Sequence, residues 1–169
     1  MRVLLLWACA LLLAGCATVG ALPQRPAAQD ITQFAFVGRL AVRQGETRYH
    51  INVDWRHDPV RDEILLTTPL GQGVAELVRD AGGARLMLAD KRSFTANDWS
   101  TLSQRVFGFP LPLGASARWL LGSTGNIEDW RVTIVEREAE QAGALPTVIE
   151  LEREDVLVRL KIDEWIEVK

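Results

Sequence analysis

Alternation of apolar and polar residues dominates the chain from residue 34 onward. Between residues 47 and 55, Thr, Tyr, Ile, Val and Trp occupy the odd positions, whereas Arg, His, Asn and Asp occupy the even ones. A period of two is typical of a strand with one buried and one solvated face. The pattern predicts about nine strands, separated by turn sequences, at residues 34–43, 47–55, 63–68, 73–79, 84–89, 92–95, 130–136, 147–152 and 156–162.

Two stretches follow a helical period instead. Residues 97–107 place Trp99, Leu102 and Val106 on one face, with Asn97 or Asp98 as the N-cap, and residues 115–121 stop at Gly122. Strands, then two helices, then strands predict a mainly β domain. We expect one strongly curved antiparallel sheet or an incomplete barrel, with the helices as a lid over the concave face.

The N-terminus has the pattern of a secretory signal. One positive charge (Arg2) precedes an apolar run that is shorter than the roughly 20 residues needed to span a bilayer, and small residues follow it. Leu13-Ala14-Gly15-Cys16 resembles the bacterial lipobox, in which the Cys thiol receives lipid and becomes the first mature residue. The alternative is an ordinary cleaved signal with a cysteine nearby by chance.

This interpretation divides the chain into three parts. Residues 1–15 are a signal peptide, residues 16–33, rich in Ala, Pro and Gln, are a lipidated flexible tether, and residues 34–169 are one β domain. Ala17, where enterobacterial lipoproteins retained in the inner membrane carry Asp, favours the periplasmic face of the outer membrane.

Composition and motifs argue against several functions. The net charge of −3 and the lack of a basic run argue against nucleic-acid binding. Of the two cysteines, Cys9 leaves with the signal and Cys16 carries lipid, so no disulfide is expected. His50 and His57 are interpreted as solvated surface residues. Since no nucleophile elbow, zinc motif, P-loop or dinucleotide motif occurs, we expect a non-enzyme without catalytic or metal-ligating residues, and without a cofactor beyond the covalent lipid.

Several short motifs, in order along the chain, resemble the LolB family of outer-membrane lipoproteins. They are Gly38-Arg39-Leu40-Ala41-Val42, Trp55, Thr68-Pro69-Leu70-Gly71-Gln72, Gly108-Phe109-Pro110-Leu111-Pro112, Trp119-Leu120-Leu121-Gly122, Trp130-Arg131-Val132 and Val158-Arg159-Leu160-Lys161-Ile162-Asp163-Glu164-Trp165. The resemblance implies an unclosed β-barrel with helices plugging one mouth. It also implies a monomeric receptor that takes lipoproteins from the periplasmic carrier LolA and inserts them into outer-membrane lipid.

The resemblance implies an apolar cavity for the acyl chains of cargo lipoproteins. The inward positions and lid face of the predicted elements supply its candidates: Leu40, Val42, Tyr49, Ile51, Val53, Trp55, Leu86, Leu88, Trp99, Leu102, Val106, Ile149 and Leu151. The alternative is that all of them pack a core, because alternation alone does not separate a core from a cavity. Leu70 matches a family leucine that protrudes from its loop and is implicated in membrane insertion.

One departure from the family concerns residues 123–129. Family members usually carry an extra hairpin between the two tryptophan motifs, but only these residues separate Gly122 from Trp130. A missing hairpin predicts a more open barrel or a smaller cavity. It favours an alternative function, a non-transporting scaffold lipoprotein in envelope assembly. A soluble LolA-like carrier is a second alternative, which the lipobox argues against, and an enzyme ranks last.

Overall fold

The computed structural model describes residues 25–140 and 143–169. The signal peptide, Cys9, Cys16 and Ala17 therefore lie outside the described residues. Within the described part, ten strands form one antiparallel sheet in the order β6-β5-β4-β3-β2-β1-β10-β9-β8-β7. The strands are β1 (Phe34–Gln44), β2 (Thr47–His57), β3 (Asp62–Thr67), β4 (Gly73–Asp80), β5 (Gly83–Leu88), β6 (Ser93–Ala96), β7 (Gly125–Ile127), β8 (Trp130–Arg137), β9 (Pro146–Arg153) and β10 (Val156–Val168).

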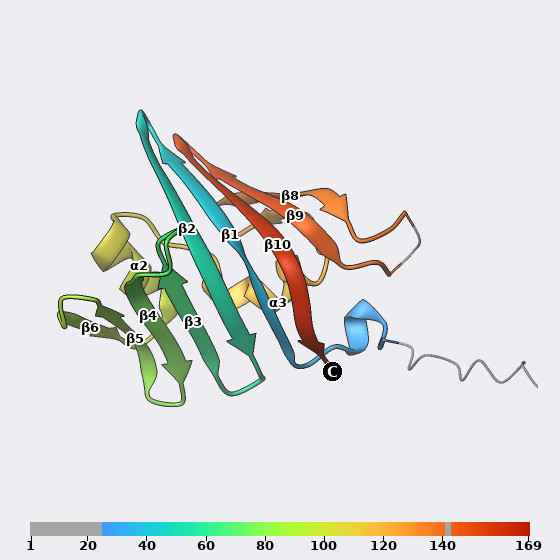
Figure 1. Cartoon of the computed structure of the whole chain (residues 1–169), viewed down its shortest axis with the longest axis horizontal. Coiled ribbons are helices and arrows are strands. Elements are labelled where there is room, and N and C mark those ends of the chain that lie inside the picture. The colour runs from blue at the N-terminus through green and yellow to red at the C-terminus, as the bar shows by residue number, and fades with distance from the viewer. Residues whose placement is uncertain (1–24, 141–142) are drawn as a thin grey trace, which may run out of the picture.

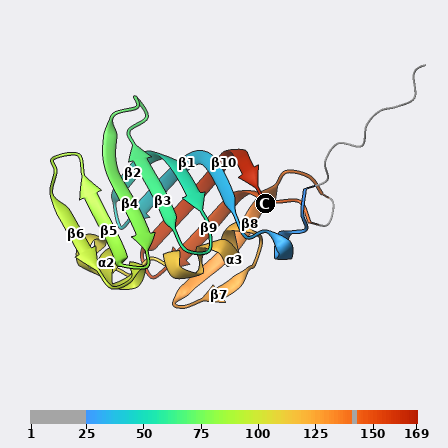
Figure 2. The same cartoon turned by 90° about the horizontal axis from the view of Figure 1, so that it is seen from below.

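The sheet is strongly curved and does not close into a barrel. Its edge strands, β6 and β7, each pair on one side only. Helices α2 (Trp99–Phe107) and α3 (Ser116–Leu120), with the 3₁₀ turn η3 (Leu113–Ala115) before α3, lie together on one side of the sheet (Figure 1, Figure 2). The predicted mainly β fold with an unclosed sheet and a helical cover is confirmed.

The first and last strands of the domain pair at the centre of the sheet (Figure 1). β1 pairs with β10 from Phe34 opposite Val168 to Gln44 opposite Val156, with two irregularities in register. The ends are joined further, because the backbone N–H groups of Thr32 and Gln33 donate to the carbonyl of Lys169 at 2.7 and 2.9 Å. This pairing holds the two halves of the sheet together.

The folded domain begins slightly before residue 34. Residues Ala28–Asp30 form the 3₁₀ turn η2, and Ile31 is buried against the core. The last residues assigned to the tether are therefore packed on the domain. Every strand and core residue that the structure describes lies between Ile31 and Val168.

Local signals account for the boundaries of α2. The side chain of Asp98 accepts a hydrogen bond from the N–H of Thr101 at 2.7 Å, which makes Asp98 rather than Asn97 the N-cap. Gly108 ends the helix in the left-handed conformation, at a φ of 84°, and its N–H donates to the carbonyl of Gln104. α2 packs against β5 and β6 at one edge of the sheet.

Residues 123–129 contain one short strand that the sequence analysis did not predict, and no complete hairpin lies within them. Gly125–Ile127 form β7, which pairs with β8 through Ile127 opposite Trp130 and Gly125 opposite Val132. Glu128 takes a positive φ of 54° in the two-residue turn. The common signal for such a turn is Asn-Gly or Asp-Gly. The turn here reads Glu128-Asp129, which lacks that signal, so the pattern of residues did not predict it.

None of the helices in the described part of the chain is long and apolar enough to cross a membrane.

The close approach of β1 to β10 generates a stability prediction at Gly38. A Cβ on this residue would lie 2.4 Å from the carbonyl oxygen of Lys161 and 3.2 Å from the Cα of Ile162, both backbone atoms of β10. We expect Gly38→Ala to lower the free energy of unfolding by about 2 kcal/mol, because the central strand pair must separate locally. Urea unfolding followed by tryptophan fluorescence measures the change.

Gly73→Ala is the matched control. Gly73 also lies in the sheet, but a Cβ there meets no atom within 4 Å. The two variants should differ clearly in midpoint, and equal midpoints would contradict the close approach.

Candidate functional site

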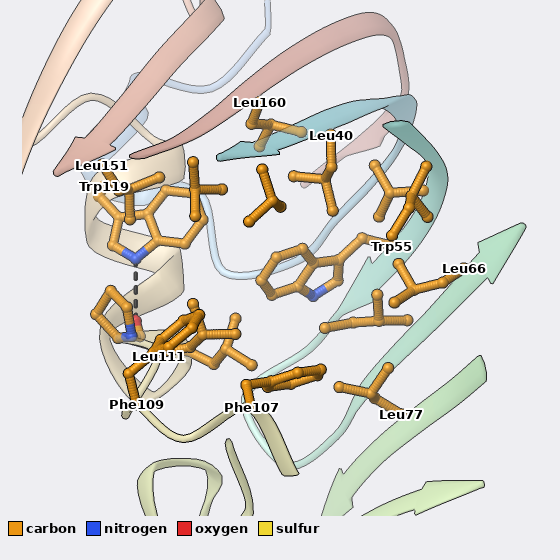
Figure 3. A pocket seen from close by; sticks show the side chains of 17 residues that line it. Leu40, Trp55, Leu66, Leu77, Phe107, Phe109, Leu111, Trp119, Leu151 and Leu160 are labelled. Atoms are coloured by element: carbon orange, nitrogen blue, oxygen red, sulfur yellow. Dashed lines mark hydrogen bonds between the residues drawn. The ribbon is translucent and has the colours of Figure 1, made fainter. Parts of the chain in front are cut away.

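An apolar cavity lies between the concave face of the sheet and the segment that follows α2 (Figure 3). Its volume is about 150 Å³. Strands β1, β2, β3, β4, β9 and β10 supply one wall, and residues 107–113 with Trp119 supply the other. We call residues 107–113 the covering segment. All lining residues are apolar: Leu40, Val42, Ile51, Val53, Trp55, Ile64, Leu66, Leu77, Phe107, Phe109, Leu111, Pro112, Leu113, Trp119, Leu151, Val158 and Leu160.

The structure brings some of the predicted cavity residues together on this lining. They are the inward residues of the central strands and one residue of β9, namely Leu40, Val42, Ile51, Val53, Trp55 and Leu151. Val53, Trp55 and Leu151 are buried, whereas Leu40, Val42 and Ile51 are half-buried. That any of them binds an acyl chain stays a prediction.

The other predicted cavity residues do not line this cavity. Leu86, Trp99, Leu102 and Ile149 are buried in the core, and Leu88 and Val106 pack against it. For these six, the alternative of simple core packing describes the structure. Tyr49 faces the same side of β2 as Ile51, but it is 52% exposed, because the end of the β1–β2 hairpin extends beyond the helices (Figure 1).

Sequence analysis missed much of the lining. Ile64 and Leu66 on β3, Leu77 on β4, and Val158 and Leu160 on β10 follow the same alternation that identified the others, so that signal could have found them. The covering segment follows no period. The motif Gly108-Phe109-Pro110-Leu111-Pro112 stands out in the sequence only through its resemblance to the family.

Three hydrogen bonds fix the covering segment over the cavity. The indole N–H groups of Trp119 and Trp130 donate to the carbonyls of Pro112 and Pro110 at 3.0 and 2.8 Å. The N–H of Leu111 donates to the hydroxyl oxygen of Ser103 at 2.8 Å. Buried backbone groups need such partners, and a segment without regular structure obtains them from side chains. Of the three donors, Ser103 and Trp119 lie on helices α2 and α3, and Trp130 lies on β8 of the sheet.

The covering segment lies over the cavity and leaves it partly open to solvent. Leu40 and Leu160 face Phe107, Phe109 and Leu111 across it (Figure 3). A cavity of 150 Å³ lined by apolar groups holds a molecule of about the size of benzene. The acyl chain of a lipoprotein is much longer. The cavity as it stands therefore holds only part of such a chain, and Phe107, 38% exposed, borders its accessible end.

The ring of Trp55 is held in the cavity wall by a buried ionic cluster. Its Nε1 donates to Asp62 at 3.2 Å, and its ring packs edge-on against Trp119 with 6.0 Å between centroids. Asp62 is 1% exposed and also accepts from Nε of Arg79, while Nδ1 of His57 lies 2.6 Å away.

The prediction that His57 is solvated is wrong, since His57 stacks on Phe34 and forms a hydrogen bond with Asp62. His50 is exposed, as expected.

The pKa of Asp62 reflects this environment. Burial of the carboxylate raises its pKa, but the hydrogen bonds from His57, Arg79 and Trp55 outweigh burial and hold the pKa below the ordinary value of 3.8. Asp62 is thus an ionised structural group. Within the described residues, no cluster of three His, Cys, Asp or Glu side chains could hold a metal ion.

Leu70 projects from the loop between β3 and β4. It is 90% exposed, and this loop extends away from the sheet (Figure 2). The loop is well defined: the N–H of Gly71 donates to the carbonyl of Thr68, and the N–H of Thr68 donates to the carbonyl of Gln72, both at 2.8 Å. Gly71 supplies the positive φ of 83° that the turn requires. An exposed apolar side chain is therefore held out by a fixed turn.

Comparison with known proteins identifies relatives over most of the chain. The family model described as "Outer membrane lipoprotein LolB" matches residues 32–129. A protein of Chromobacterium violaceum named "Outer-membrane lipoprotein LolB" is 36% identical over 97% of this chain and 98% of its own length. A protein of the same name from Azoarcus sp. is 32% identical over 91% of this chain and 89% of its length. Among solved structures, a LolA superfamily protein of Nitrosomonas europaea matches with a TM-score of 0.46 and 10% identity, over 85% of this chain and 86% of that one.

The Asp62 cluster generates a pH prediction. We expect Asp62→Asn to lower the free energy of unfolding by about 2 kcal/mol at neutral pH, because it leaves Arg79 without its buried partner. The pKa of Asp62 is lower in the folded than in the unfolded chain, so its contribution is complete above the ordinary pKa of 3.8 and is lost as pH falls through the folded pKa. The difference between the two proteins should therefore shrink in acid.

Urea unfolding at a series of pH values measures this difference. Asp54→Asn is the control, because Asp54 is partly exposed on β2 and its contact with Arg56 is 3.7 Å long. A difference that stays constant into acid would show that the ionised carboxylate of Asp62 is not what stabilises the cluster.

Proposed function

The chain belongs to the LolB family of outer-membrane lipoproteins, and from this membership we propose that it is a receptor in lipoprotein localisation. It accepts lipoproteins from a LolA-like periplasmic carrier, holds their acyl chains against the concave face of its sheet, and passes them to the outer membrane. Its role is binding and transfer, without covalent chemistry on the cargo and without a cofactor, and it works as a monomer.

The observation that carries the proposal is the apolar cavity under the covering segment. Burial of an acyl chain is favourable by roughly 0.8 kcal/mol for each CH₂ group, so even part of a chain gains affinity there. Cargo moves from the carrier to this domain if the domain binds the chains better, since differential affinity sets the direction. Release to the membrane requires that the affinity stay moderate.

Admission of a chain requires an open form of the domain. The covering segment separates from the sheet when the hydrogen bond from Trp130 on β8 to the carbonyl of Pro110 breaks, and the chain then replaces Phe107, Phe109 and Leu111 against the strands. The apolar surface exposed by opening is covered again by cargo. Opening is therefore favoured when a chain is present and disfavoured when it is absent.

We propose further that a lipid on Cys16 anchors the protein and that the residues before η2 serve as its tether. Several acyl chains on one cysteine give an effectively permanent attachment. The protein then meets its carrier from the periplasmic face of the outer membrane. Leu70, held out by its turn, is the residue we assign to contact with lipid during insertion.

A second candidate function is a scaffold in envelope assembly that does not transport lipoproteins. The small volume of the cavity, about 150 Å³, favours this alternative. A scaffold with a closed core has no need to exchange its covering segment for an acyl chain, so transfer of cargo distinguishes the two functions.

A transfer assay tests the proposed function. A lipoprotein is loaded onto the carrier, the domain without its lipid anchor is added, and the protein that holds the cargo is identified after separation. We expect cargo to move to the domain. Val42→Trp should reduce this transfer severalfold, because a large ring at a half-buried lining position fills the cavity.

Val135→Trp is the control for Val42→Trp. Val135 is 43% exposed on β8 and does not line the cavity, so its replacement should leave transfer unchanged. If cargo stays on a competent carrier while the added domain is folded, the receptor function is rejected and the scaffold is favoured.

Leu70→Glu tests the insertion step separately. The side chain is fully in solvent, so the variant should fold normally and accept cargo from the carrier. Delivery of cargo into vesicles should fall at least tenfold, because a charged group cannot enter the apolar layer of the membrane. Val60→Glu, which changes another exposed loop residue (71%) between β2 and β3, should deliver normally. Normal delivery by Leu70→Glu would remove Leu70 from the mechanism.

A further inference from the structure

The convex face of the sheet carries a concentrated positive charge that the cargo cavity does not use. Along β1, β2 and β10, the residues between those that line the cavity point outward, and many of them are basic. Strand pairing places Arg43 opposite Arg48, and Arg39 opposite Lys161. Arg159 lies opposite Ala41, which is flanked on its other side by His50. We call Arg39, Arg43, Arg48, Arg159 and Lys161 the basic patch.

Acidic side chains neutralise the basic patch only in part. Arg39 forms a bidentate ion pair with Asp163, in which its Nε and Nη2 donate to the carboxylate oxygens at 2.9 and 2.7 Å. Arg159 forms an ion pair with Glu150. Arg43, Arg48 and Lys161 form no ion pair with any residue that the structure describes. The excess of positive charge is notable in a chain whose net charge is −3.

This arrangement costs stability in the isolated domain. Like charges directly opposite on neighbouring strands repel each other, as at Arg43 and Arg48. An anionic partner removes this repulsion, and arginine in particular binds phosphate groups through two parallel hydrogen bonds. The charge pattern therefore fits a phosphate-bearing surface.

A groove places this charge beside the β3–β4 loop. Its volume is about 250 Å³, and Arg39, His50, Arg159 and Lys161 line it together with Pro69. Pro69 precedes Leu70, and the loop is tied to β2 because the side-chain amide of Asn52 donates to the carbonyl of Thr68 at 3.1 Å. Leu70, the most exposed large hydrophobic side chain of the described structure, thus projects beside the groove that holds the charge.

We propose that the basic patch binds the headgroup phosphates of anionic phospholipids while Leu70 enters the apolar layer of the same membrane. The inference rests on the proposed function, since it assigns the surface with which the receptor meets the membrane. An exposed apolar residue next to basic residues is the combination that holds a protein at a lipid surface. It also orients the domain, with the convex centre of the sheet toward the headgroups.

Vesicle binding by the domain beginning at residue 25 tests the proposal, since all described strands and core residues lie within it. Binding is measured by co-sedimentation with vesicles of phosphatidylcholine alone and of phosphatidylcholine mixed with phosphatidylglycerol. We expect preferential binding to the anionic vesicles, which weakens as salt is added. The double variant Arg43→Gln, Lys161→Gln should reduce that binding by about tenfold.

The double variant Arg92→Gln, Arg131→Gln is the matched control. It removes the same charge from side chains that are 68% and 71% exposed elsewhere on the surface. It should bind anionic vesicles nearly as the unchanged domain does. Equal losses in the two double variants, or equal binding to both kinds of vesicle, would overturn the proposal.

Carrier-to-domain transfer in solution separates this inference from the proposed function. The Arg43→Gln, Lys161→Gln variant should accept cargo from the carrier normally, because neither residue lines the cavity. If the variant loses transfer in solution, the patch is a contact surface for the carrier protein and the lipid assignment is wrong. If the unchanged domain binds anionic vesicles but accepts no cargo, the proposed function fails while the membrane surface stands.

Discussion

The antiparallel pairing of β1 with β10 is the constraint on which the rest of the structure depends. It joins β6–β1 to β10–β7, so without it the sheet would be two separate pieces, each with an exposed apolar face. The approach is so close that only glycine fits at position 38. Because these strands are also the centre of the curvature, their inward residues, Leu40 and Leu160 among them, face the covering segment.

An unclosed sheet leaves its concave face to be covered by other parts of the chain, and here the cover is an irregular segment. Two tryptophan indoles and one serine hold it through its backbone. That solution satisfies the buried polar groups of the segment while keeping its attachment local. On the opposite wall, the buried carboxylate of Asp62 holds the indole ring of Trp55 in place. In the proposed function, the wall that contains Trp55 stays in place while the covering segment moves to admit and release an apolar chain.

The two faces of the sheet divide the proposed work. In these proposals, cargo binds on the concave face, while the convex face and the Leu70 loop meet the membrane. Period-two alternation makes this possible, because neighbouring residues such as Val42 and Arg43 point to opposite faces. Strands β1, β2 and β10 therefore contribute to both surfaces.

Alternation, turn residues and caps were enough to predict all strands except β7, as well as both helices, since these are local properties of the chain. The inward positions Leu40, Val42, Ile51, Val53, Trp55 and Leu151 could be predicted for the same reason. Whether an inward residue borders a cavity, as Ile51 does, or is packed in the core, as Ile149 is, depends on what lies opposite it across the fold. Only the tertiary structure decided that, because it set the course of the covering segment. It also decided the burial of His57, which depends on its contacts with Asp62 and Phe34. It decided the gathering of basic residues as well, because the pairing of β1 with β10 joins positions more than 100 residues apart.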